Sequence, residues 1–125
     1  MRAFWLSVLF VFACSVTADD LERTMKDMAF QYKQAYETQT GSEMIPHLEQ
    51  LITLTEQASQ ANFAEDKAET FKDGLQKVLT QLQAAKTAAG QDNIELAKNH
   101  LREVDTLRKD YHKQRKVSLW QLLFG

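Results

Sequence analysis

The chain has 125 residues, and its 15 Lys and Arg against 17 Asp and Glu leave a formal net charge of −2. This length predicts one domain, and the slightly acidic balance argues against nucleic acid as a partner. One Pro, four Gly and the absence of any stretch that alternates apolar and polar residues predict an all-α protein.

Residues 1–18 have the pattern of a secretory signal peptide. Arg2 precedes an apolar run over residues 3–13, and small residues up to Ala18 suit cleavage before Asp19. The run is shorter than the roughly 20 residues of a permanent membrane helix, so we expect no integral membrane segment in the mature chain. As an alternative, residues 11–14 loosely match a lipoprotein cleavage site that would anchor the protein through Cys14.

Cleavage after Ala18 would remove Cys14, the only cysteine. The mature chain would then have no disulfide, no thiolate ligand for a metal and no Cys-x-x-Cys-His motif for covalent attachment of haem.

The first helix is predicted over residues 20–39, where acidic residues suit the start of a helix. Gly41 is predicted to end it, and Ser42 to cap the second helix. The apolar residues of the first helix recur every three or four positions, as on one helical face; they are Leu21, Met25, Met28, Tyr32 and Ala35.

Similar periodicity predicts helices over residues 43–59, 67–88 and 92–116, with a loop near residues 61–66 and Gly90 as the end of the third helix. Short connections make neighbouring helices antiparallel, so we predict an up-down-up-down four-helix bundle over residues 19–116. Residues 117–125 form an apolar tail.

In this topology Met25, near the start of the first helix, and His112, near the end of the last, share one end of the bundle. Phe71 and Leu75 belong to the same end. A thioether and an imidazole that face each other can hold a haem iron from both sides. The helical rise puts His47 about 30 Å from that end and His100 about 18 Å from His112, so both are interpreted as ordinary polar positions.

Periodicity alone leaves other interpretations open. Methionine on an apolar stripe is usually core filler, and a histidine near a helix end is often merely half-buried. The protein would then be a haem-free bundle, such as an adaptor or stress protein. A third possibility is a haem or copper scavenger, since Met and His also suit Cu(I).

Three motifs resemble the soluble periplasmic cytochrome b562 family. Residues 20–25 match its Asp-Leu-Glu-x-x-Met, and residues 108–112 match its Arg-x-x-Tyr-His. Residues 71–75 match Phe-x-x-Gly-Phe except for Leu75 in place of the last aromatic. The family's Met and His are axial ligands of haem, and the third motif faces the haem.

The resemblance implies a periplasmic b-type cytochrome that carries electrons, with non-covalent haem b ligated by Met25 and His112. We expect Phe71, Leu75, Arg108 and Lys116 to contact the cofactor, with a basic residue near a haem propionate. We also expect a monomer that exchanges electrons with a redox partner protein. The sequence has no acid–base pair, nucleophile motif or glycine-rich phosphate loop, so we do not expect an enzyme.

Charge is distributed unevenly along the chain. Residues 19–69 hold eleven acids and four bases, whereas residues 98–116 hold seven bases and three acids. We expect this basic helix to pair with its acidic neighbours; the alternative is a docking face for an acidic partner or for haem propionates. The tail, with Trp120 and Phe124, is predicted to extend the last helix over the bundle end, or to contact a partner or a membrane.

Overall fold

The computed structural model describes residues 18–60 and 65–124, and within them the side chains of residues 21–60, 69–111 and 113. The predicted signal peptide, with Cys14, lies outside this part except for Ala18. The helices are α1 (Ala18–Tyr36), α2 (Gly41–Ser59), α3 (Glu65–Gly90) and α4 (Ile94–Phe124). The described residues contain no strand, and the predicted all-α class is confirmed.

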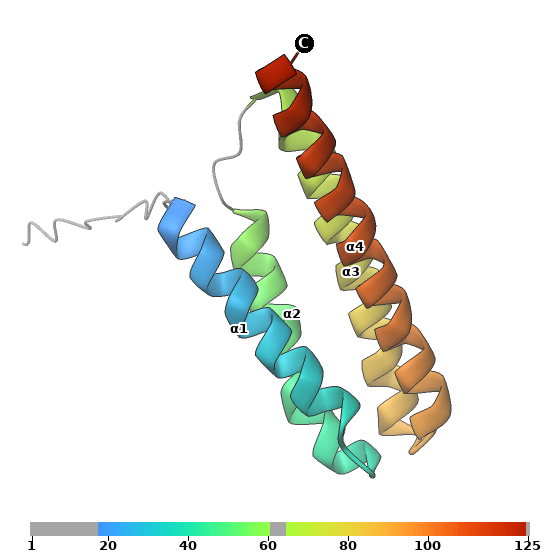
Figure 1. Ribbon diagram of the computed structural model, residues 1–125. Coiled ribbons are helices and arrows are strands. Elements are labelled where there is room, and N and C mark those ends of the chain that lie inside the picture. Colours follow the sequence, from blue (N-terminus) through green and yellow to red (C-terminus); the bar gives the residue numbers. More distant parts are fainter. Residues whose placement is uncertain (1–17, 61–64, 125) are drawn as a thin grey trace, which may run out of the picture.

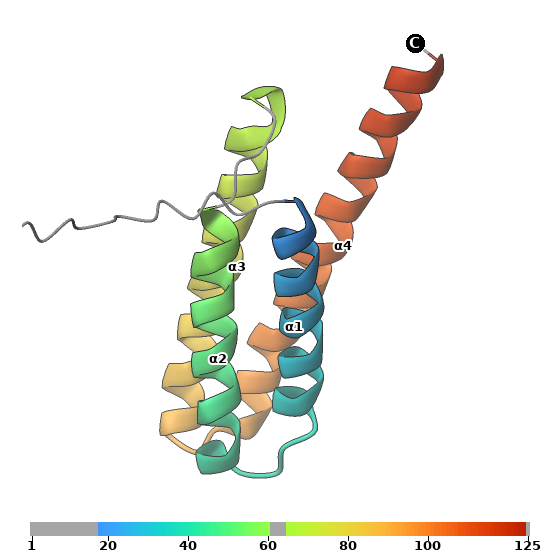
Figure 2. The same cartoon turned by 90° about the vertical axis from the view of Figure 1, so that its left-hand side faces the viewer.

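Successive helices run antiparallel, which confirms the predicted bundle. The α1–α2 and α3–α4 turns lie at one end of the molecule, and the start of α1 and the end of α2 lie toward the other (Figures 1 and 2). α2 packs along α1 and α3, and α3 packs along α4, whereas α1 and α4 touch at only a few points. The bundle is therefore well packed along three of its four helix–helix seams and loosely packed along the α1–α4 seam.

The core consists of apolar residues that recur at helical spacing on the inner faces of the helices. Thr55 is the buried polar residue among them, and its hydroxyl donates to the carbonyl of Leu51 at 2.7 Å, so the group is satisfied without leaving α2. The central cluster comprises Ala35, Met44, Leu48, Leu51, Val78, Leu82, Ala85, Ala88, Ala89, Ala97, Leu101 and Val104.

The first helix ends three residues earlier than predicted. The Thr38 hydroxyl donates to the carbonyl of Ala35 at 2.7 Å. The Thr38 N–H donates to the same carbonyl at 3.2 Å, so the chain tightens into a turn here and α1 ends at Tyr36.

The start of α2 corrects a second prediction. Its N-cap is Thr40, whose backbone is extended and whose hydroxyl accepts from the N–H of Glu43 at 3.2 Å. The prediction that Ser42 is the cap is wrong, and Gly41 is the first residue of α2 rather than the end of α1. Ser and Thr both make good caps, so the position where the backbone turns into the helix decides between them.

Gly41 is buried where the two turns of this end meet. Its N–H donates to Oδ1 of Asp92 at 3.0 Å, and a Cβ on Gly41 would overlap the carbonyl oxygen of Ala89. Asp92 has a left-handed φ of 55° and closes α3 just after Gly90. The close approach of the two turns therefore requires glycine at position 41.

The backbone of residues 117–124 continues α4 as helix. In Figure 2 this C-terminal part runs on beyond the ends of α1 and α2. Its side chains lie outside the described residues, so the covering role of the tail stays a prediction. Within the described part of the chain, no helix combines the length and apolar character that crossing a bilayer requires.

We expect Gly41→Ala to lower the free energy of unfolding by about 1–3 kcal/mol, the usual cost of overpacking. The added methyl group would meet a backbone carbonyl that cannot move without displacing the end of α3. Urea unfolding measures the change.

Gly90→Ala is the matched control, because no atom lies within 4 Å of a Cβ there. It should leave the midpoint unchanged or raise it slightly. Equal midpoints for the two variants would contradict the account of the meeting turns.

Candidate functional site: an apolar cavity beside the open seam

A cavity of about 270 Å³ lies at the end of the bundle where α1 begins. This is close to the lower end of the size range of small-molecule sites, about 300 Å³. Asp105 and Arg108 are the charged residues of its wall, and the others are apolar or aromatic. The wall consists of Met25, Met28, Ala29, Tyr32, Leu51, Phe71, Gly74, Leu75, Val78, Val104, Asp105, Leu107, Arg108 and Tyr111.

Helical periodicity explains why α1 supplies four of these residues. Met25, Met28, Ala29 and Tyr32 follow one another at spacings of three, one and three, so they lie on one side of the helix. Met28 and Tyr32 also pack against the core cluster. Met25 is 37% exposed and lines the cavity, so this residue lies where the cavity meets solvent.

Helix α3 supplies the residues of the third motif. Phe71, Gly74, Leu75 and Val78 line the cavity, and Leu75 is buried. Phe71 and Leu75 thus lie on the wall where we predicted contact with a cofactor. Leucine in place of an aromatic at position 75 keeps this wall apolar.

Helix α4 supplies Arg108 and Tyr111 to the wall next to that of α3. His112 follows Tyr111 directly in α4, but its side chain lies outside the described residues, as does that of Lys116. The structure therefore brings Met25, Phe71, Leu75 and Arg108 together around one cavity, and the backbone at position 112 lies next to it. Whether Met25 and His112 ligate a metal stays a prediction.

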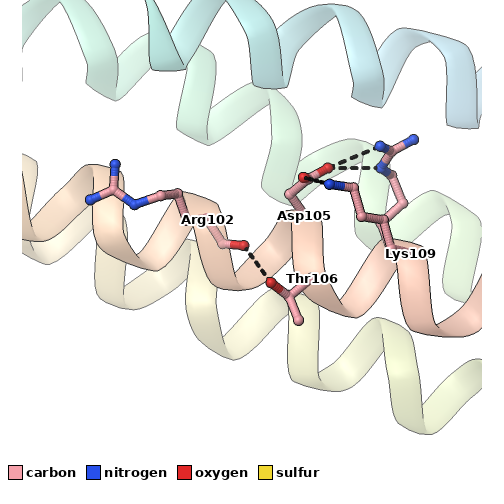
Figure 3. A network of polar contacts seen from close by, with 5 residues as sticks. Arg102, Asp105, Thr106 and Lys109 are labelled. Atoms are coloured by element: carbon pink, nitrogen blue, oxygen red, sulfur yellow. Dashed lines mark hydrogen bonds and ion pairs between the residues drawn. The ribbon is translucent and has the colours of Figure 1, made fainter.

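Asp105 organises the charge at the rim (Figure 3). Arg108 donates to its Oδ1 from Nε at 3.2 Å and from Nη2 at 2.9 Å, and Lys109 Nζ lies 3.0 Å from Oδ2. The hydrogen bond from Lys109, and then that from Arg108, lower the pKa of Asp105 against the opposing effect of burial. Asp105 is thus paired with two cations, of which Arg108 lines the cavity and Lys109 does not.

Sequence reasoning missed Asp105, although its spacing of three and four residues from Arg108 and Lys109 is typical of helical ion pairs.

The sequence analysis also missed the role of Tyr32 in the cavity wall. Burial, and then the negative charge of Asp105, raise the pKa of the Tyr32 phenol. Tyr32 is therefore a neutral member of the wall at physiological pH.

Contacts around Tyr36 hold α1 to α4. Tyr36 lies one turn after Tyr32 along α1, whereas Met25 lies about two turns before it. Arg102 Nη1 donates to the Tyr36 hydroxyl at 2.8 Å, and Lys98 Nζ lies 5.5 Å from the centre of the Tyr36 ring. The rings of Tyr32 and Tyr36 stack with centroids 6.0 Å apart. This cluster joins two helices that otherwise touch little, and it leaves the seam open beside the cavity.

The other two histidines are engaged elsewhere. His47 Nδ1 and Gln31 Oε1 lie 2.8 Å apart between α2 and α1, and His100 Nδ1 and Gln81 Oε1 lie 2.7 Å apart between α4 and α3. Neither histidine lines the cavity. Both make ordinary polar contacts between helices.

A family model described as cytochrome b562 matches residues 20–116. This span contains the whole of the cavity wall. A search of curated proteins found no match. Membership of the matched family suggests a b-type haem-binding electron carrier rather than an enzyme, and such proteins are usually periplasmic. Because the match covers most of the chain, the protein belongs to the cytochrome b562 family.

Proposed function

We propose that this protein is a periplasmic electron carrier that binds haem b non-covalently, with Met25 and His112 as the axial ligands of the iron. The observation that supports the proposal most directly is the apolar cavity beside the open α1–α4 seam. Its wall carries Met25 on one helix, and Tyr111, the neighbour of His112, on another.

The cavity suits a flat apolar ring with anionic edges. Phe71, Leu75 and Val78 provide an apolar wall that excludes water. Arg108 lines the cavity, and its guanidinium would bind a haem propionate there in exchange for part of its contact with Asp105.

Haem b, when bound, takes up and releases one electron at a time. The thioether of Met25 would stabilise the reduced form and raise the reduction potential. Met25 and His112 together would hold the iron and would leave it no position for oxygen or a substrate, as suits an electron carrier.

The remaining parts of the proposal concern the setting of the protein. We propose export by a cleaved signal peptide over residues 1–18, with a lipid anchor at Cys14 as the alternative. The carrier would act as a monomer and exchange electrons with a partner protein. Haem titration of the purified protein tests the central proposal, because low-spin haem should form at one equivalent, whereas a haem-free adaptor would bind none.

We expect Met25→Ala to retain haem through His112 while one coordination position opens. The ferric spectrum should become high-spin, and the reduced protein should bind carbon monoxide. Met28→Ala is the matched control, because Met28 lines the same cavity one turn later. The reverse pattern would mean that Met28 is the ligand.

We expect His112→Ala to abolish the low-spin spectrum and to weaken haem binding, since the imidazole is the stronger of the two ligands. His47→Ala and His100→Ala should leave the spectrum unchanged, because each histidine contacts a glutamine away from the cavity. A low-spin spectrum retained by His112→Ala would rule out this ligand.

We expect Arg108→Gln to weaken haem binding by about two- to fivefold, the effect of one exposed ion pair. The difference should shrink in 1 M salt, where such pairs are screened. Lys86→Gln is the control, because Lys86 pairs with Glu49 and does not line the cavity. Equal affinities for wild type and Arg108→Gln at low salt would remove Arg108 from the site.

A further inference from the structure

Gly74 of α3 lies directly under the ring of Tyr111 of α4. A Cβ on Gly74 would overlap Cζ of that ring and lie 2.5 Å from Cε2 and 2.7 Å from Cε1. Separations below about 3 Å do not occur at real Cβ atoms, so a side chain at position 74 would require the Tyr111 ring to move. Both residues line the cavity.

Glycine inside a helix is unfavourable relative to alanine, because it loses more conformational freedom on folding. Gly74 lies in the interior of α3, whereas Gly90 is the last residue of that helix. The two glycines also differ in their surroundings, since a Cβ on Gly90 would meet nothing within 4 Å. The contact with Tyr111 is therefore a specific reason for glycine at position 74.

The contact matters because α3, and not α1, is the main support of this part of α4. α1 and α4 touch at few points, and the contacts of Tyr36 with Arg102 and Lys98 lie about two and a half turns or more before Tyr111 along α4. Packing against α3 consequently sets the rotation of α4 at the cavity. Position 112 is one residue further on, about 1.5 Å along the helix and about 100° around it.

We propose that Gly74 is a positioning residue for the haem. By admitting the Tyr111 ring against α3, it sets the rotation of α4 and hence the approach of His112 to the iron. This inference rests on the proposed function, in which His112 is an axial ligand. A methyl group at position 74 would push the ring out of its place and turn α4, so that His112 would meet the iron in a poorer geometry.

Gly74→Ala tests the proposal in the haem-loaded protein. We expect haem affinity to fall about tenfold or more and a high-spin fraction to appear in the ferric spectrum. Gly90→Ala is the matched control in the same helix and should bind haem as the wild type does. Heat unfolding of both apo-proteins shows how far each substitution changes stability alone.

Tyr111→Leu provides the second test, because leucine has no ring to occupy the space over Gly74. Gly74→Ala should cost much less haem affinity and low-spin signal in the Tyr111→Leu background than in the wild type, as expected for two residues in contact. An equal loss in both backgrounds would show that the methyl group does not act through Tyr111, and would overturn the proposal.

A Gly74→Ala protein with the wild-type haem spectrum and affinity would also overturn the proposal. If the apo form of that variant melts earlier than the wild type, the contact serves stability alone. A wild-type protein that forms no low-spin haem would instead overturn the ligand assignment itself, so the two failures are distinguishable.

Discussion

The cavity depends on the incomplete contact between α1 and α4. Three pairs of sequential helices pack along their lengths, and their inner faces form the core cluster. The first and last helices meet mainly through Tyr36, which accepts from Arg102 and lies under Lys98. The site thus lies in a region that the core does not fill, and all four helices contribute to its wall.

The core cluster and the cavity wall lie next to each other and share Leu51, Val78 and Val104. The cluster around Leu48, Leu82 and Leu101 is fully buried within the polypeptide. The cavity end carries the more exposed apolar side chain Met25, together with the charged residues Asp105 and Arg108. An apolar cofactor bound there would bury surface that the polypeptide alone leaves open, and so would add stability by binding the folded state.

The architecture and much of the cavity wall could be predicted from the sequence, because they follow from the helical period and short connections. Periodicity puts Met25, Phe71 and Leu75 on inner faces, and antiparallel topology brings those faces to one end. The cap of α2 was predicted wrongly, since Thr40 and Ser42 both have suitable hydroxyl groups. Only the backbone path decides that Thr40 bonds to Glu43.

Contacts between helices were harder to predict. The pairing of Arg102 with Tyr36 joins residues far apart in the chain and depends on the rotation of both helices. Gly74 formed part of a recognisable motif, but its contact with Tyr111 requires the distance between α3 and α4. The ion pairs of Asp105, in contrast, lie within one helix and follow from spacing alone.

The loosely packed seam also has a consequence for folding. The well-packed helix pairs are neighbours in sequence, so their contacts close short stretches of chain, and proteins dominated by such local contacts fold quickly. Contact between α1 and α4 must instead close nearly the whole described chain, which costs more entropy. Because that seam contributes few contacts, the bundle avoids most of the slow, long-range step. The loosely packed α1–α4 seam, which leaves space for a ligand, therefore also lowers the entropic cost of forming the fold.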